Sequence, residues 1–300
     1  MNPRAQQLKN IRKTYLLMAL FLIFVVAVGW IFSYIFGNQN ILYFAIGFSF
    51  LMNFFSYFFS DKIVLKMSGA KQIERSANRD LFDIVERLAR QARLPAPKIY
   101  IINDQSPNAF ATGRNARNSA VAVTTGLLNI LDQRELEGVI AHELSHINNK
   151  DILLATIVVV LVGFISLLSD FFLRASFFRS LGGGDNNNNQ AGTIMTIAGI
   201  ILAILTPFVA MLIQLAISRK REFLADASGA TLTHNPAGLA TALEKISQNG
   251  TQMKRVSHAT AHLYISNPYK RKQSTGFIAK MFLTHPPVEE RVHALLGKNH

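Results

Sequence analysis

Long uninterrupted apolar runs, rather than alternating apolar and polar positions, are the strongest pattern in the chain. Residues 15–36 and 41–60 carry no charge, and each run is long enough to cross a bilayer, which takes roughly 20 helical residues. Only the polar sequence GNQN at 37–40 separates them, so residues 1–60 are predicted to form a transmembrane helical hairpin. A signal peptide is not expected, because the apolar core is too long, no A-x-A site follows it and a second span comes at once.

Two further apolar runs lie in the second half of the chain, at residues 152–173 and 193–217. The sequence LGGGDNNNNQAG at 181–192 joins them as a predicted solvated loop. Asp170 in the first run is expected at the far membrane interface, with a buried relay or ion site as the other interpretation. Pro207 is a candidate kink in the second run. We predict two more spans, and the alternative is a hairpin that enters the bilayer part-way or forms a buried core.

The stretches between the apolar runs show shorter, mixed patterns. Residues 76–93 carry apolar side chains at helical spacing, while KIYIIND at 98–104 and AVAVTT at 120–125 are predicted strands. Asp132 and Glu135 resemble a capping box that opens the next helix. Further helices are predicted over residues 221–230, continuing the fourth apolar run, over 237–247, and over 287–296 with Pro287 in the first turn.

These patterns indicate a mainly α protein, with a four-helix transmembrane part and a mixed α and β part outside the bilayer. We expect four consecutive segments, in which two hairpins alternate with two parts of the extramembrane domain. Their boundaries are 1–60, 61–151, 152–217 and 218–300.

The charge distribution favours a lipid bilayer, and no nucleic acid, as the partner of the chain. Half of the residues are hydrophobic, only 16% are charged, and the net charge is +13. Basic residues gather beside the apolar runs, as Arg12, Lys13 and residues 219–221 show, and no aromatic-basic motif accompanies them. By the positive-inside rule, both termini and the segments 61–151 and 218–300 are expected in the cytoplasm. The chain has no cysteine, which excludes disulfides, thiolate ligands and a cysteine nucleophile.

The sequence AHELSH at 141–146 carries the candidate chemistry. His142 and His146 lie four residues apart on one face of the predicted helix, so both imidazoles can bind one ion. Glu143 lies about 100° round the helix, where it can reach a water molecule at the metal without binding the metal itself. An ordinary helix with two surface histidines and a glutamate is the alternative.

A catalytic zinc ion takes three protein ligands and leaves one position open. Without cysteine the third ligand must be His, Glu or Asp, and no third histidine follows at the H-x-x-G-x-x-H spacing. REFLAD at 221–226 is the natural candidate, with Glu222 as a ligand and Asp226 as the acid that orients a histidine. His258 and His262 also lie four apart, but they lack the following glutamate and a nearby acid, so no second metal site is expected there.

Taken together, the motifs resemble those of the HtpX-type membrane zinc metalloproteases, which are related to the CAAX prenyl endopeptidases. AHELSH joined to REFLAD between apolar runs is specific, and the resemblance covers most of the chain beyond residue 60. The matching stretches are NAFATG (108–113), AVAVTTGLL (120–128), ELEGVIAHELSHINNKD (135–151), SRKREFLAD (218–226), AHLYISNP (261–268) and HPPVEERV (285–292).

The resemblance implies an α+β zincin-like metalloprotease domain on the cytoplasmic side, with one Zn²⁺ per chain. It implies His142, His146 and Glu222 as the zinc ligands, Glu143 as the general base, and Asp226 as the acid behind the ligands.

Three more residues enter through the resemblance alone. Asn108 and Phe110 are implied to lie along the substrate cleft, where a strand edge could hold an extended peptide by backbone hydrogen bonds. A simple turn between two strands is the alternative for this segment. His285 either helps to stabilise the oxyanion or caps the last helix.

The expected function is hydrolysis of peptide bonds in membrane or membrane-associated proteins at the cytoplasmic face of a bacterial inner membrane. The resemblance implies a role in the quality control of damaged membrane proteins. Zinc would polarise the scissile carbonyl and acidify a water molecule, and Glu143 would transfer the proton to the leaving amine. The alternatives are a processing protease for a substrate such as a prenylated C-terminus and a non-catalytic membrane assembly factor. The sequence gives no indication of the oligomeric state.

Overall fold

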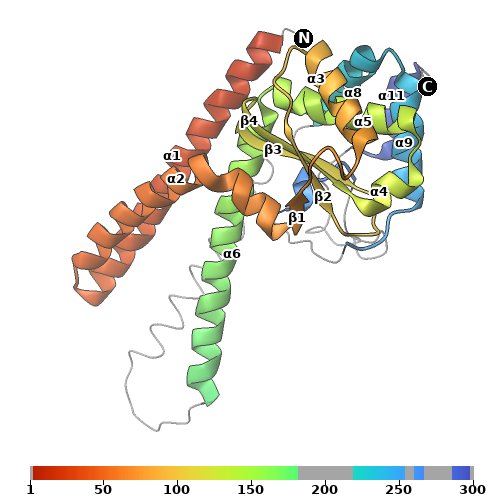
Figure 1. The fold of residues 1–300 in the computed structure, drawn as a ribbon. Helices are drawn as coiled ribbons and strands as arrows, with labels where there is room; N and C mark the ends of the chain where they lie inside the picture. Colours follow the sequence, from red (N-terminus) through yellow and green to blue (C-terminus); the bar gives the residue numbers. More distant parts are fainter. Residues whose placement is uncertain (1–2, 182–218, 254–259, 267–285, 298–300) are drawn as a thin grey trace.

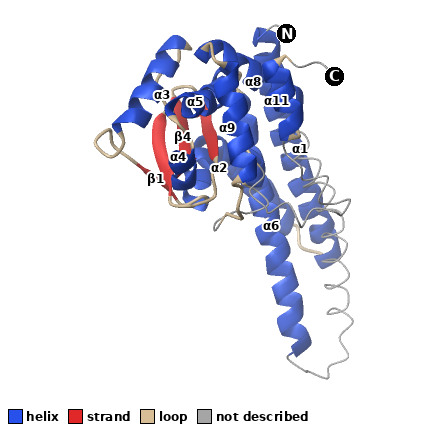
Figure 2. Ribbon diagram, turned by 90° about the vertical axis from the view of Figure 1, so that its right-hand side faces the viewer, coloured by secondary structure: helices blue, strands red, loops and turns tan. Residues whose placement is uncertain are grey.

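The structure of the protein, a computed structural model, describes residues 3–181, 219–253, 260–266 and 286–297. Long helices extend away from a part that contains a four-stranded sheet and shorter helices (Figure 1). After a quarter turn, Figure 2 shows the strands enclosed by helices, with α6 leading away from them. The described part of the chain is therefore mainly helical with one mixed sheet, as predicted.

Helices α1 (Pro3–Phe36) and α2 (Asn40–Met67) pack side by side as the predicted hairpin (Figure 1). The chain reverses direction at Gly37, where φ is 61°, a value that glycine adopts without strain. Both helices are long and apolar enough to cross a membrane. Between positions 45 and 60, the buried residues of α2 are small or polar, which allows close helix packing: Ala45, Ser49, Asn53, Ser56 and Ser60.

Helix α6 (Asp151–Leu181) contains the third apolar run and begins after a bend of 85° from the preceding helix. Its first half packs against α1, α2 and the sheet. Its residues from Leu154 to Ile165 contribute to a first hydrophobic core, which these elements share. Side chains beyond Ser166 are not described, so both interpretations of Asp170 stay open. The Asn-rich loop and the fourth apolar run, with Pro207, lie outside the described residues. Two candidate spans are found among the described helices, and a four-span membrane part stays a prediction.

The sheet has the strand order β1–β2–β4–β3. The two predicted strands are β2 (Lys98–Ile102) and β4 (Asn118–Thr124), which pair in parallel. β3 (Ala109–Asn115) pairs antiparallel with β4 and forms one edge, so the NAFATG stretch is a strand and not a turn. β1 (Ala70–Gln72) forms the other edge, and with three residues it is too short for its periodicity to reveal it.

A second hydrophobic core lies between the sheet and the shorter helices, and helix α5 (Gln133–Asn148) contributes to its centre. The first turn of α5 confirms the predicted capping box, because Asp132 accepts the backbone N–H of Glu135 while Glu135 accepts the N–H of Asp132. Gly138 allows a neighbouring helix to approach, since a Cβ there would lie 2.8 Å from the Cα of Leu239.

The remaining helices surround α5 and match most of the predicted ranges. The last helix begins one residue later than predicted, because Pro287 is its N-cap residue and not part of the first turn. The bounds are α3 (Arg79–Gln91), α4 (Thr125–Ile130), α8 (Arg219–Thr233), α9 (Pro236–Gln248), the 3₁₀ turn Ala261–Leu263 and α11 (Val288–Leu296).

Candidate metal centre

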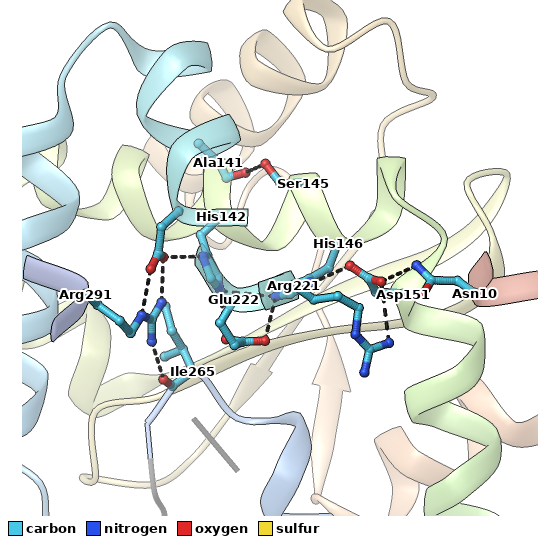
Figure 3. A network of polar contacts seen from close by, with 11 residues as sticks. Asn10, Ala141, His142, Ser145, His146, Asp151, Arg221, Glu222, Ile265 and Arg291 are labelled. Carbon is cyan, nitrogen blue, oxygen red and sulfur yellow. Dashed lines mark hydrogen bonds and ion pairs between the residues drawn. The ribbon is translucent and has the colours of Figure 1, made fainter. Parts of the chain in front are cut away.

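Two imidazole rings of α5 and one carboxylate of α8 converge on a single point (Figure 3). The Nε2 atoms of His142 and His146 are 3.1 Å apart. The carboxylate oxygens of Glu222 lie 3.8 Å from Nε2 of His142 and 3.6 Å from Nε2 of His146. Among the described residues this is the one group of three candidate metal ligands, and it brings together the three that the sequence predicts.

The close approach of α5 and α8 depends on Gly229. Glu222, Asp226 and Gly229 lie at i, i+4 and i+7 of α8 and therefore share one face. A Cβ on Gly229 would lie 3.0 Å from the backbone nitrogen of His142 and 3.2 Å from the carbonyl carbon of Ala141. The absent side chain thus lets the helix that carries the carboxylate ligand rest directly on the helix that carries the histidines.

The second nitrogen of each ring, Nδ1, faces a carboxylate. Nδ1 of His142 is 2.9 Å from Asp226, and Nδ1 of His146 is 3.1 Å from Asp151. An ionised carboxylate only accepts hydrogen bonds, so it favours the tautomer with the proton on Nδ1 and the lone pair on Nε2. Two lone pairs that face each other cannot form a hydrogen bond, whereas a cation between them can bind both.

The spacing of the three ligand atoms fits a zinc ion. Zinc binds nitrogen at about 2.0–2.1 Å, and a tetrahedral site therefore separates neighbouring ligand atoms by roughly 3.3 Å. The observed separations run from 3.1 to 3.8 Å. Two histidines and one glutamate, with a fourth position left for water or substrate, are a donor set of catalytic zinc.

Burial and neighbouring charges shift the pKa values around the centre. Burial lowers the pKa of His142 to about 4, although Asp226 acts in the opposite direction. Burial also acts to lower the pKa of His146, but the hydrogen bond to Asp151 and nearby negative charge raise it to about 9. For Asp226, burial is outweighed by the guanidinium of Arg291, and the pKa falls to about 2. Burial thus favours the neutral imidazole of His142, whereas the carboxylates around His146 favour a positive charge on that ring.

Glu143 follows the first ligand histidine and is buried. Burial raises the pKa of its carboxyl group to about 7, although the charge of His146 and a backbone hydrogen bond from Ala111 lower it. A carboxyl group with a pKa near neutrality is suited to take up and return a proton. Because Ala111 belongs to β3, the candidate base lies beside the edge strand of the sheet.

Sequence reasoning did not identify two residues that support the ligands. Asp151, the first residue of α6, contacts His146. Arg291 of α11 donates hydrogen bonds of 2.7 and 2.8 Å to Asp226 and one of 3.2 Å to the carbonyl of Ile265. In the sequence, Asp151 is only an acid at the start of a helix, and Arg291 is only a single arginine in HPPVEERV. Both patterns are common on solvated helices, so neither residue could be recognised as a support of the ligands.

Asn108 and Phe110 lie at β3 with their side chains buried inside the protein. The amide of Asn108 donates to the carbonyl of Ser266 at 3.0 Å and accepts from its N–H at 3.2 Å. The ring of Phe110 packs edge-on against Tyr264, with ring centres 5.2 Å apart. Both side chains thus join the edge strand to residues 264–266, and their contact with substrate stays a prediction.

Of the other histidines singled out in the sequence, only His262 lies among the described residues, and it does not join this group. His262 is buried and lies 3.2 Å from the carbonyl oxygen of Ala155. His258 and His285 fall outside the described residues, so the proposed role of His285 stays a prediction.

A metal centre of this composition on an HExxH helix, in a chain that carries membrane-spanning helices, is that of a membrane metalloprotease. Comparison with known proteins narrows the class. Residues 75–299 match the family model described as Peptidase family M48, and the chain belongs to this family. It is an HtpX-type zinc metalloprotease, which confirms the class predicted from AHELSH and REFLAD.

Similar proteins span nearly the whole chain. A protease HtpX homolog from Caldanaerobacter subterraneus is 46% identical over 96% of this chain and 95% of that protein. One from Thermococcus sibiricus is 44% identical over 94% of each. The crystal structure of Ste24p from S. mikatae is similar in fold, with a TM-score of 0.50 and 19% identity over 94% of this chain and 65% of that one.

Proposed function

We propose that the protein cleaves membrane or membrane-associated proteins, with zinc held by His142, His146 and Glu222 and with Glu143 as the general base. The observation that carries this proposal is the convergence of the three ligand atoms within 4.8 Å of one another, beside the buried Glu143. The apolar hairpin supports the choice of substrate, because it keeps the catalytic centre close to the bilayer in which such substrates lie.

Bound zinc supplies a Lewis acid that polarises the scissile carbonyl and acidifies a water molecule. The Glu143 carboxylate accepts the proton of the attacking water and later donates it to the leaving amine, for which a pKa near 7 is suitable. Asp226 and Asp151 hold the Nδ1 atoms of the ligand histidines and keep their Nε2 lone pairs directed at the metal. Arg291 keeps Asp226 ionised and fixed in place.

The edge strand β3 is the proposed binding site for an extended substrate. Two of its outward-facing backbone groups already have partners within the protein, because the carbonyl of Ala109 accepts the N–H of Ile265 at 3.0 Å and the N–H of Ala111 reaches Glu143. A substrate is therefore proposed to pair with the edge next to these positions. A peptide added along this edge would pass beside the general base. We propose that Asn108 and Phe110 border the peptide and hold the strand in position.

We further propose that the protein lies in a bacterial cytoplasmic membrane with four spans, and that both termini and the active site face the cytoplasm. The basic residues beside the apolar runs support this orientation. Segments 61–151 and 218–300 then form one protease domain around the metal centre, separated in sequence by the second hairpin. Turnover of damaged membrane proteins is the proposed cellular role.

The test uses the purified, zinc-loaded full chain in detergent with an unfolded membrane protein as substrate. Glu143→Gln is expected to retain one zinc per chain and to lose about 10²–10⁴-fold in cleavage rate, because only the proton transfer is removed. A chelator should abolish cleavage by the unchanged protein, and added zinc should restore it. Glu137→Gln is the matched control, since this glutamate lies on the same helix and pairs with Arg87 at the surface.

Full cleavage activity in Glu143→Gln would exclude this residue as the base. A chain that binds no zinc would support a non-catalytic membrane factor. A prenylated peptide, offered in parallel, should be cleaved poorly, and preferential cleavage of this peptide would favour the narrow processing protease.

A further inference from the structure

The N-terminal part of α1, the first apolar helix, contacts the end of the helix that carries the ligand histidines. At this junction α5 ends, Lys150 adopts a left-handed φ of 58°, and α6 begins after the 85° bend. The last carbonyl groups of a helix have no partner within that helix and must bond elsewhere. Here the partners come from α1, more than a hundred residues earlier in the chain.

Two side chains of α1 supply these hydrogen bonds. Gln7 donates from Nε2 to the carbonyl of Asn148 at 2.7 Å. Asn10 donates from Nδ2 to the carbonyl of Asn149 at 3.0 Å. Asn10 is 1% exposed, whereas its neighbours Leu8 and Lys9 are exposed, so this amide is built into the junction.

Asn10 makes a second contact that Gln7 does not make. Its Nδ2 also donates to Oδ1 of Asp151, and Oδ2 of the same carboxylate lies 3.1 Å from Nδ1 of His146 (Figure 3). Arg221 approaches Oδ1 at 3.5 Å from another side. An amide nitrogen has two hydrogens, so one can bond the helix end and the other the carboxylate, which fixes the plane of Asp151 relative to α5.

We propose that Asn10 is a positioning residue for the metal centre, acting through Asp151 on the imidazole of His146. The inference rests on the proposed zinc site. It means that α1 supports the metal centre as well as anchoring the protein, because one of its side chains helps to orient a zinc ligand. A displacement of α1 in the membrane would change the affinity for zinc.

The test is a double-mutant cycle on the full chain in detergent, with zinc affinity measured by competition with a chelator. Asp151→Asn should weaken zinc binding about 10–100-fold, and Asn10→Ala about tenfold. In the Asp151→Asn background, Asn10→Ala should change the affinity by less than about twofold, because its pathway to His146 has been removed. Gln7→Ala is the matched control, since it removes a hydrogen bond to the same helix end without touching Asp151, and it should leave zinc affinity unchanged.

Turnover gives a second readout. Loss of ligand orientation should lower kcat of Asn10→Ala at saturating zinc and leave KM unchanged. The proposal is overturned if Asn10→Ala weakens zinc binding equally in both backgrounds, if it has no effect, or if Gln7→Ala has the same effect. If the unchanged protein fails to bind zinc, the proposed zinc site itself has failed.

Discussion

Each histidine of the metal centre uses its two ring nitrogens for different tasks. Nε2 faces the metal position, and Nδ1 faces a carboxylate that selects the tautomer. Behind His142 the order of contacts is Asp226, then Arg291, and the arginine also bonds the carbonyl of Ile265. A buried acid is therefore kept ionised by a buried base, and the same base ties the C-terminal helix to the segment that pairs with β3.

At the residue scale we predict that Arg291→Gln destabilises the protein strongly. The side chain of Arg291 is 1% exposed, and removing one partner of a buried ion pair leaves the other charge without compensation. The free energy of unfolding should fall by about 3–5 kcal/mol. The measurement is denaturant unfolding of the zinc-free protein in detergent.

The control for this prediction is Arg87→Gln, which breaks an ion pair at the surface. Because exposed pairs are screened by solvent, this change should cost only about 0–1 kcal/mol. Equal destabilisation by both variants would mean that the Arg291–Asp226 pair has no special role in the fold.

At the scale of elements, the site depends on how closely α5, α8 and β3 approach one another. Periodicity predicts α5 and its capping box because these are local features of a helix, and both are confirmed. Periodicity does not reveal β1, because this strand has only three residues. It also leaves the NAFATG stretch undecided between strand and turn, because the pairing of an edge strand depends on the strand beside it in the sheet. The contact of α8 with α5 likewise depends on a single glycine whose neighbour lies in another part of the chain.

We predict that Gly229→Ala weakens zinc binding. Alanine favours a helix over glycine by about 1 kcal/mol, but here the added Cβ would press on the backbone of His142 and Ala141, which cannot rotate away. The helix that carries Glu222 must shift, so both zinc content after dialysis and the melting temperature should fall.

Gly163→Ala in α6 is the matched control, because its Cβ would meet only the end of the Met67 side chain, at 4.0 Å. This variant should retain zinc and stability. Normal zinc content in Gly229→Ala would show that α8 tolerates a wider separation from α5.

At the scale of the whole molecule, the apolar hairpin and the protease domain share one core. Leu17 and Phe21 of α1 pack in the same buried cluster as Leu154 and Val158 of α6 and Phe110 of β3. The hairpin is therefore packed onto the domain and is more than a flexible tether. Its orientation in the membrane decides on which side proteolysis takes place.

The absence of native cysteine allows a direct test of this orientation. Gln39 at the turn of the hairpin and Glu74 after α2 are both exposed, so a single cysteine at either position can react with a maleimide. We expect Gln39→Cys to react with a membrane-impermeant maleimide in intact cells, and Glu74→Cys to react only after the cells are permeabilised. The opposite pattern would invert the proposed topology.

The apolar spans of the hairpin could be predicted from the sequence, and so could the HExxH helix and the three candidate ligands. The spans and the histidine pair depend on spacing along a single helix, which the helical period translates directly into geometry. Glu222 lies on a second helix, and the REFLAD motif is what singled it out. Asp226 was also predicted as the acid behind a histidine, whereas the roles of Asp151, Arg291 and Asn10 emerge from the three-dimensional packing alone. Arg291 reaches Asp226 across 65 positions, and Asn10 reaches Asp151 across 141. Such contacts follow from the packing of whole elements, and no local pattern encodes a distance between segments so far apart in the chain.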